Sequence, residues 1–178
     1  MPQDRLKVLI TEEALQARLR EMAAEIDAAY RDSPGLLVVG LLRGSFVFIA
    51  DLVRHLKVPL EVDFLVASSY GKGKESSREV RILKDLDEEV EGRDLLLVED
   101  IVDTGYTLDS VVRLLATRGP RSIRLCSLLS KPSRREIEVP LDWCGFEIPD
   151  AFVVGYGIDY AQRNRNLPYI AEMLPVKA

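Results

Sequence analysis

The chain has 178 residues, a length that suits one domain with room for a small additional subdomain. Hydrophobic residues make up 47% and charged residues 30%, as in ordinary globular proteins, and a formal net charge of −5 argues against an overall field that attracts nucleic acid. No uncharged stretch reaches the roughly 18 residues of a membrane-spanning helix, and residues 1–5 do not start an apolar export signal, so we expect a cytoplasmic protein that does not enter the membrane.

The first half of the chain alternates between helical and strand patterns. Apolar residues recur every three or four positions over 12–31, which predicts a helix with Thr11 as its N-cap. Residues 36–42 form a near-continuous apolar run, which is typical of a strand buried on both faces of a parallel sheet. Arg43-Gly44-Ser45 is predicted to open a second helix, and residues 60–67 a second strand.

The second half continues the same alternation. The polar, glycine-containing stretch 68–79 is predicted to be a mobile loop, and 80–83 a short strand that returns from it. Residues 95–98 are a buried strand, and a helix is predicted to follow from about Thr107 and to stop at Gly119-Pro120. A further strand is then expected over 123–129.

Strands and helices in this order predict an α/β fold with a mainly parallel, twisted sheet flanked by helices. We expect a single domain over 1–178, with a core at about 35–130 and a small hood formed by the N-terminal segment and about 131–178. In such sheets, ligands bind beyond the carboxyl ends of the strands. Candidate functional residues are therefore sought there.

An acidic, hydroxyl-rich turn over 99–107 directly follows the strand at 95–98. Its second part, Thr104-Gly105-Tyr106-Thr107, leads into a helix N-terminus, where free N–H groups and the helix dipole favour an anion. Gly105 lets backbone amides close around a phosphate, and the threonine hydroxyls add donors. The turn is therefore a candidate phosphate site.

The carboxylates of this turn suggest further contacts. Glu99 and Asp100 suit two adjacent sugar hydroxyls or a metal, and Asp103 is left near the ring of a bound base, where it can exchange a proton. The alternative is that Asp103 and Thr104 cap the helix while the other acids are solvated. Capping explains one Asp or Thr, but it does not explain two adjacent acids after four apolar residues, so we favour a functional turn.

Residues 98–108 resemble the phosphoribosyl-pyrophosphate motif of type I phosphoribosyltransferases. Over nearly its whole length the chain resembles the bacterial hypoxanthine (hypoxanthine-guanine) phosphoribosyltransferases. The other stretches that carry this resemblance are 41–46, 68–71, 81–86, 131–135 and 152–160. The resemblance implies a Mg²⁺-dependent transfer of the 5-phosphoribosyl group from phosphoribosyl pyrophosphate to N9 of hypoxanthine or guanine, which gives IMP or GMP and pyrophosphate.

The resemblance also implies how phosphoribosyl pyrophosphate is held. Binding of its ribose phosphate falls to Glu99, Asp100, Asp103, Thr104, Gly105, Tyr106 and Thr107. Arg43, Gly44 and Arg165 match pyrophosphate contacts, although many relatives carry lysine in place of Arg43, and the family can have a cis peptide before this residue. Ser69-Tyr70 matches the start of a flexible loop that closes over the site, although an idle hairpin would have the same sequence character.

Base recognition and metal binding are implied in the same way. Lys131 matches a lysine that donates to O6 of the purine, Phe152 an aromatic residue that stacks on the ring, and Val153 a backbone contact to the base. Asp159 matches a metal-binding acid, beside Glu99 and Asp100. From pattern alone, Lys131 would be a surface lysine and Phe152 a core residue. The resemblance further implies that Asp103 handles the N7 proton of the purine.

Other classes of protein fit less well. A regulator that reuses this fold to bind RNA or DNA should carry an added basic surface, and neither GxGxxG nor GxxxxGK[ST] is present for a dinucleotide- or nucleoside-triphosphate-binding enzyme. An enzyme that prefers xanthine or a pyrimidine is the alternative within the family. Cys126 and Cys144 are expected to be buried free thiols, and His55 a surface residue at a helix end. Homodimers or homotetramers are expected from the resemblance.

Overall fold

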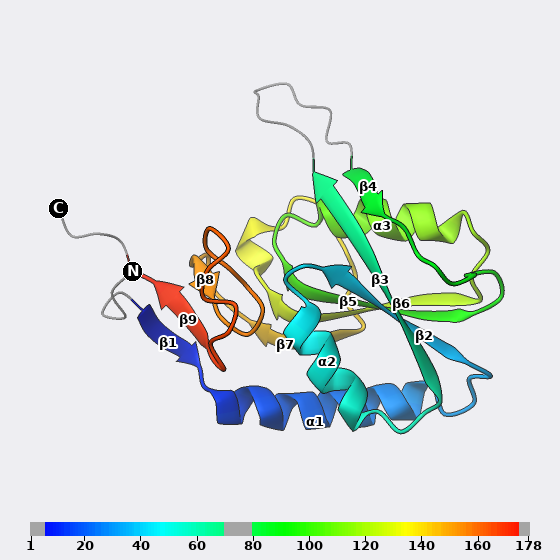
Figure 1. Cartoon of the computed structure of the whole chain (residues 1–178), viewed down its shortest axis with the longest axis horizontal. Helices are drawn as coiled ribbons and strands as arrows, with labels where there is room; N and C mark the ends of the chain where they lie inside the picture. Colours follow the sequence, from blue (N-terminus) through cyan, green and yellow to red (C-terminus); the bar gives the residue numbers. More distant parts are fainter. Residues whose placement is uncertain (1–5, 70–79, 175–178) are drawn as a thin grey trace.

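The computed structural model describes residues 6–69 and 80–174 (Figure 1). In chain order the elements are β1 (Leu6–Ile10), α1 (Glu12–Ala29), β2 (Leu36–Leu42), α2 (Phe46–His55), β3 (Leu60–Ser69), β4 (Val80–Lys84), β5 (Asp94–Val102), α3 (Tyr106–Ala116), β6 (Ser122–Ser130), the short 3-10 helix η2 (Pro132–Arg134), β7 (Trp143–Glu147), β8 (Val153–Val154) and β9 (Ile170–Met173). Within these described residues, no helix is long and apolar enough to cross a membrane.

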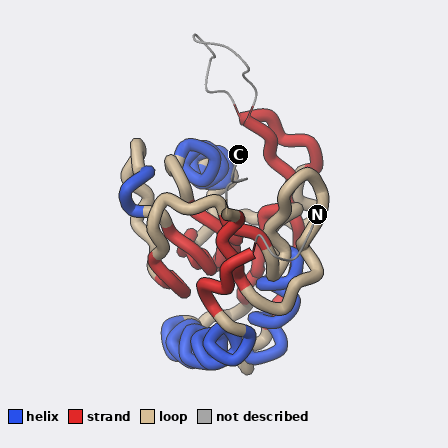
Figure 2. Tube along the Cα trace, turned by 90° about the vertical axis from the view of Figure 1, so that its left-hand side faces the viewer, coloured by secondary structure: helices blue, strands red, loops and turns tan. Residues whose placement is uncertain are grey.

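Two sheets organise these elements. The larger has six strands in the order β4-β3-β2-β5-β6-β7, and all neighbours are parallel except β3 and β4. The smaller is antiparallel, in the order β1-β9-β8, and lies at one end of the molecule (Figure 1). Helices lie on both sides of the large sheet (Figure 2). The predicted α/β fold with a mainly parallel sheet is therefore confirmed.

The apolar run in β2 explains why this strand is central. Its residues point alternately to opposite faces of the sheet. Leu36 and Val38 belong to the hydrophobic cluster that also contains buried residues of α1 and α2, whereas Leu37, Val39 and Leu41 belong to the cluster of α3. Because both faces are covered, every position of the strand except its last is buried, and a continuous apolar sequence is required.

Two strands, β5 and β3, end two or more residues later than predicted. β5 continues to Val102, so Glu99 and Asp100 lie in the strand and not in a turn beyond it. The reason is the neighbouring strand: β6 pairs with Glu99, Ile101 and Val102 in parallel register, which extends the ladder. In the same way, pairing with β4 extends β3 to Ser69, so the loop predicted over 68–79 begins later. Its remainder, including Tyr70, lies outside the described residues.

The large sheet also continues past the expected core boundary near residue 130. β7 pairs with β6 in parallel, with Cys126 opposite Trp143 and Leu129 opposite Phe146. Apolar residues of this segment therefore pack in the main core, although the sequence pattern there is irregular. Both cysteines are free and Cys126 is buried, as predicted, whereas Cys144 is only half-buried.

The amino end of β5 is held by a buried acid. Asp94 accepts hydrogen bonds from Ser33 Oγ at 2.6 Å, Ser122 Oγ at 2.7 Å and Arg121 Nε at 2.9 Å. Its side chain is 7% exposed, whereas that of Arg121 is 46% exposed. Hydrogen bonding from Arg121, helped by the two serines, holds the pKa of Asp94 well below its usual value although burial acts in the opposite direction.

The variant Asp94→Asn should lower the free energy of unfolding at neutral pH by about 1–3 kcal/mol, because Arg121 and the hydroxyls would lose a charged acceptor. The folded-state pKa is depressed, so this stabilisation is fully present above the unfolded value of about 4 and is lost as the pH falls below it. Urea unfolding at neutral and acidic pH should therefore show a gap between variant and parent that narrows in acid. Glu91→Gln, at an exposed position, is the matched control.

Candidate active site

Parallel pairing places the carboxyl ends of β2, β5 and β6 at one edge of the large sheet. The segments that follow these strands are 43–45, 103–105 and 131–134. They contain the predicted pyrophosphate loop, the predicted phosphate turn and the predicted base-selecting lysine. Residues far apart in the sequence are thus brought to one edge, where ligands of this class of sheet bind.

The phosphate turn closes on Gly105, the N-cap of α3. Its φ of 94° is in the left-handed region that favours glycine. A Cβ on this residue would also lie 2.5 Å from the carbonyl oxygen of Ile137. That neighbouring segment is itself attached to the turn, because the backbone amides of Glu136 and Ile137 both donate to the carbonyl of Thr104 at 3.0 Å.

The turn encloses a small hollow of about 150 Å³ at the start of α3. It is lined by Glu99, Ile101, Val102, Asp103, Thr104, Gly105, Thr107 and Leu108. Most of the residues predicted to hold the ribose phosphate therefore face one cavity. Unpaired N–H groups at the first turn of a helix favour an anion there.

The two acids near the end of β5 lie against each other and against the pyrophosphate loop. Burial, and next the charge of Asp100, raise the pKa of Glu99 well above its usual value. Asp100 is buried, and its carboxylate lies so close to Gly44 that a Cβ there would be 1.7 Å from Oδ2. In the described part of the chain, neither acid has an ion-pair partner within 4.0 Å. Two adjacent carboxylates without a counter-charge suit a cation.

The three predicted metal-binding acids are not gathered into one cluster. Among residues 6–69 and 80–174, no group of three potential metal ligands is found. Asp159 pairs with Arg165 at 2.7 Å and accepts a hydrogen bond from the amide of Gln162. The donor set still fits Mg²⁺, which keeps several waters and takes few protein ligands together with substrate oxygens.

The pyrophosphate loop is built by packing of glycines. The Leu42–Arg43 peptide is cis. Gly157, at a φ of 101°, packs against the backbone of Gly44, so that a Cβ would lie 2.2 Å from the Gly44 carbonyl oxygen. Arg165 then donates to the carbonyl of Gly157 at 2.8 Å. These contacts bring the predicted pyrophosphate residues Arg43, Gly44 and Arg165 into one region.

Residues predicted to contact the base lie directly after β6, in the loop before β8 and in β8 itself. Lys131 is buried, and its backbone amide donates to the carbonyl of Val102 at 3.0 Å. Phe152 is 53% exposed, which is high for an aromatic side chain, and its ring meets that of Tyr160 edge to face at 5.5 Å. Val153 is buried in β8. The exposure of Phe152 contradicts the core alternative.

Asp103 has contacts that sequence reasoning did not assign. Arg134 Nε donates to Asp103 Oδ1 at 3.2 Å, and Arg135 Nη1 donates to the Asp103 carbonyl at 3.0 Å. Arg134 also lies 3.7 Å from Asp150, which in turn is 3.7 Å from Lys131 Nζ. The sequence feature that could have identified these contacts is the pair Arg134 and Arg135, which follows Lys131 shortly after the carboxyl end of β6.

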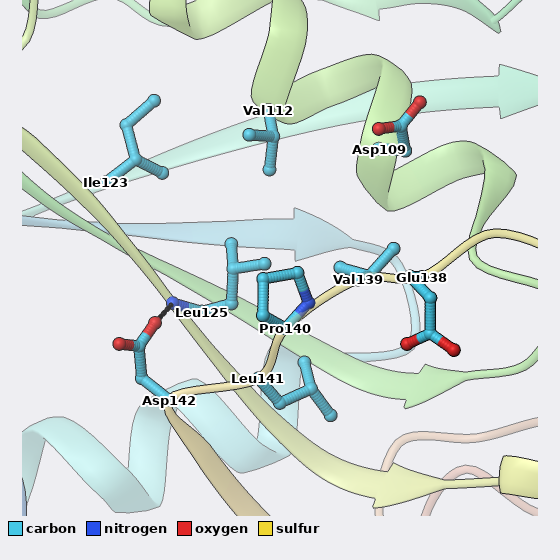
Figure 3. A pocket seen from close by; sticks show the side chains of 9 residues that line it. All are labelled: Asp109, Val112, Ile123, Leu125, Glu138, Val139, Pro140, Leu141 and Asp142. Carbon is cyan, nitrogen blue, oxygen red and sulfur yellow. Dashed lines mark hydrogen bonds between the residues drawn. The ribbon is translucent and has the colours of Figure 1, made fainter.

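A larger hollow of about 310 Å³ lies between α3, β6 and residues 138–142 (Figure 3). Its lining is mostly aliphatic, and the Asp142 carboxylate at its side accepts a hydrogen bond from the amide of Leu125 at 2.8 Å. It shares no lining residue with the hollow at the phosphate turn. The predicted site residues therefore do not line this hollow but lie at the adjoining edge of the sheet.

Comparison with known proteins agrees with this geometry. Residues 9–161 match the model of the phosphoribosyl transferase domain. A hypoxanthine phosphoribosyltransferase of Haemophilus influenzae is 53% identical over 176 residues, which cover 98% of each chain, and a hypoxanthine-guanine phosphoribosyltransferase of Bacillus subtilis is 50% identical over 98% of this chain and 97% of its own. A crystal structure of a hypoxanthine phosphoribosyltransferase from Staphylococcus aureus superposes with a TM-score of 0.92 at 43% identity, over 97% of this chain and 94% of that one. The chain belongs to the phosphoribosyltransferase family.

Proposed function

We propose that this protein is a purine-salvage enzyme that transfers the 5-phosphoribosyl group of phosphoribosyl pyrophosphate to N9 of hypoxanthine or guanine. The products are IMP or GMP and pyrophosphate. The observation that carries the proposal is the meeting of the phosphate turn at Gly105, the acid Asp103 and the buried Lys131 at one sheet edge. Relatives about 50% identical over nearly the whole chain carry the same activity in their names.

In this proposal each group has one task. The 5′-phosphate lies on the backbone amides and hydroxyls of the turn from Thr104 to Thr107, and the ribose hydroxyls face Glu99 and Asp100. Arg43, Gly44 and Arg165 hold the pyrophosphate. The bond from C1 to pyrophosphate breaks with its electron pair leaving on the oxygen, N9 attacks C1 from the opposite face, and Asp103 accepts the proton from N7.

Glu99 and Asp100 would hold Mg²⁺ through substrate oxygens and water, and Asp159, which is not clustered with them, would contribute to metal binding separately. Bound there, the ion would neutralise negative charge on the departing pyrophosphate. The pairing of Asp159 with Arg165 supports this arrangement, because it puts a carboxylate beside a residue proposed to contact the same leaving group. Closure of a loop that begins at Ser69-Tyr70 would exclude water from the sugar cation, and this role stays a prediction.

Selection of a 6-oxopurine follows from donor chemistry. An ammonium at Lys131 can donate to O6, whereas adenine would present its own amino donor at that position. Xanthine as the preferred base stays the alternative, because Lys131 does not read the 2-position of the ring. The backbone of Val153 is proposed to meet the Watson–Crick edge of the purine.

Stacking on Phe152 gives a testable consequence. The variant Phe152→Ala should raise KM for hypoxanthine about 10-fold, since base–aromatic stacking contributes about 1–3 kcal/mol. The melting temperature should change little, because the ring is half-exposed. Val8→Ala, which truncates another exposed apolar side chain on β1, is the control. Equal KM values in both variants would contradict a stacking role.

The deciding experiment for the function is a steady-state assay of pyrophosphate release. Hypoxanthine, guanine, xanthine and adenine would each be offered with phosphoribosyl pyrophosphate, with and without Mg²⁺. We expect turnover with the 6-oxopurines, none with adenine and dependence on the metal. Absence of turnover with both hypoxanthine and guanine would overturn the proposal.

We also propose that residues 1–178 form one domain, because a single hydrophobic cluster contains Ile10 and Ile170 of the small sheet together with Leu36 and Val98 of the large one. A cytoplasmic homodimer or homotetramer that binds no nucleic acid is proposed with it. Sedimentation would test the oligomeric state, and a nucleic-acid mobility assay at physiological salt would test the expected lack of nucleic-acid binding.

A further inference from the structure

Four side chains of alternating charge run across the base-binding side of the site. Arg134 Nε lies 3.2 Å from Asp103 Oδ1, and Arg134 Nη1 lies 3.7 Å from Asp150 Oδ2. Asp150 Oδ1 is in turn 3.7 Å from the ammonium of Lys131. The order is therefore acid, arginine, acid, lysine, with two proposed substrate-binding groups at the ends and two residues without an assigned role between them.

The shape of a purine requires Lys131 and Asp103 to lie close together without forming an ion pair with each other. O6 and N7 lie on the same edge of the ring, so a donor aimed at O6 and an acid aimed at N7 must approach side by side. Lys131 and Asp103 carry opposite charges and would attract each other. A direct ion pair between them would occupy the hydrogen-bonding positions that the base needs.

Arg134 and Asp150 give each end group a different partner. The Lys131 side chain is only 10% exposed, and in the described part of the chain Asp150 is the carboxylate found within 4.0 Å of its ammonium. A buried ammonium requires such a counter-charge. At the other end, the guanidinium of Arg134 holds one oxygen of Asp103.

Local backbone structure fixes the spacing of this arrangement. Lys131 is the N-cap of the short helix η2, in which the amide of Arg134 donates to the carbonyl of Lys131 at 3.0 Å. The hydrogen bond therefore fixes the positions of the Lys131 and Arg134 side chains relative to each other. Asp150 approaches from the loop before β8, in which Phe152 also lies. The acid thus belongs to the segment that carries the proposed stacking residue.

We propose that Arg134 and Asp150 are positioning residues, which together form a bridge that keeps Asp103 and Lys131 apart and directed at the same edge of the purine. This inference rests on the proposed function, since it takes Asp103 and Lys131 to be the groups that meet N7 and O6. The bridge itself does not touch the reacting atoms. Its effect is on base binding and proton acceptance, and not on binding of phosphoribosyl pyrophosphate.

The test uses Asp150→Asn and Arg134→Gln in the full-length enzyme. Asp150→Asn and Arg134→Gln should each lower kcat/KM for hypoxanthine by about 10-fold, at the lower end of what loss of an outer partner costs a site. KM for phosphoribosyl pyrophosphate should stay at the parent value in both. The double variant should lose no more than the worse single variant, because the bridge works as one unit.

Conservative variants separate positioning from simple loss of stability. Asp150→Glu and Arg134→Lys keep the charges and should therefore retain part of the activity that Asp150→Asn and Arg134→Gln lose. If the loss came from a less stable fold, it would not depend on whether the replacement keeps the charge. Glu61→Gln is the matched control: it removes an ion pair of 2.9 Å with Arg93 at the amino end of β3, the opposite edge of the sheet. This control should retain parent kinetics.

Two more variants separate failure of this inference from failure of the proposed function. If Asp103→Asn and Lys131→Ala leave turnover unchanged, the proposed roles of the end groups are wrong and the bridge falls with them. If those variants lose activity while Asp150→Asn and Arg134→Gln behave like Glu61→Gln, only the bridge is refuted. Equal rises in KM for both substrates, or additive losses in the double variant, would also overturn it.

Discussion

Replacement of Asp103 by asparagine should lower kcat with hypoxanthine by about 10²–10⁴-fold, the usual contribution of acid–base catalysis. Asparagine has nearly the same shape, and its amide oxygen can still accept the hydrogen bond from Arg134 Nε that the carboxylate accepts at 3.2 Å. It cannot take a proton from N7. The loss should therefore fall on turnover and leave the melting temperature and the affinity for phosphoribosyl pyrophosphate near their parent values.

The control for this variant is Asp109→Asn, on the first turn of α3. Asp109 forms an i,i+4 ion pair with the exposed Arg113 at 2.9 Å and has no proposed task in the reaction, and helix pairs of this kind contribute little. Single-turnover rates and calorimetric titration with phosphoribosyl pyrophosphate would separate chemistry from binding. Parent-like turnover in Asp103→Asn would remove this acid from the mechanism.

Local patterns were sufficient to predict most of the fold. The helix predicted over 12–31 corresponds to α1, and its N-cap is confirmed, because the amide of Ala14 donates to Thr11 Oγ1 at 3.3 Å. The apolar run at 36–42 is β2, as expected for a strand that is covered on both faces. Such features depend on residues close in sequence, so periodicity and capping chemistry can identify them.

Strand ends were harder to predict because they depend on a partner strand. Glu99 and Asp100 look like turn residues in isolation, since they are acidic and follow four apolar positions. They lie in β5 because β6 continues beside them as far as Ser130. The same physical reason applies to Ser68 and Ser69, whose strand conformation depends on pairing with β4.

The site was predictable where one short segment carries it and not where distant segments meet. The turn from Thr104 to Thr107 could be found because its residues are contiguous and its glycine has a clear conformational use. Nothing in the local sequence indicates that Asp150 reaches Lys131, since that contact depends on how the loop before β8 lies over β6. The resemblance identified individual residues but did not indicate the contacts among them.

The close contact between Gly44 of the pyrophosphate loop and Asp100 of β5 predicts a second variant with a large effect on activity. The variant Gly44→Ala should lower kcat/KM for phosphoribosyl pyrophosphate by about 10²-fold, which a displacement of about 1 Å in a reacting assembly can cause. Gly44 does not have a positive φ, so its backbone conformation is open to alanine. The added methyl group would instead lie 1.7 Å from Asp100 Oδ2 and 2.4 Å from its Cγ.

Because this methyl group cannot overlap the carboxylate, Asp100 must turn away from the position where we propose that it meets the ribose and the metal. The effect should therefore appear in kinetics more than in stability. Gly35→Ala is the matched control, since a Cβ there has no atom within 4 Å. Isothermal titration of each variant with phosphoribosyl pyrophosphate and Mg²⁺ should show weakened binding only for Gly44→Ala. Similar affinities in the two variants would mean that Asp100 does not take part in substrate or metal binding, and the grouping of Asp100 with the pyrophosphate loop would then be only a feature of packing.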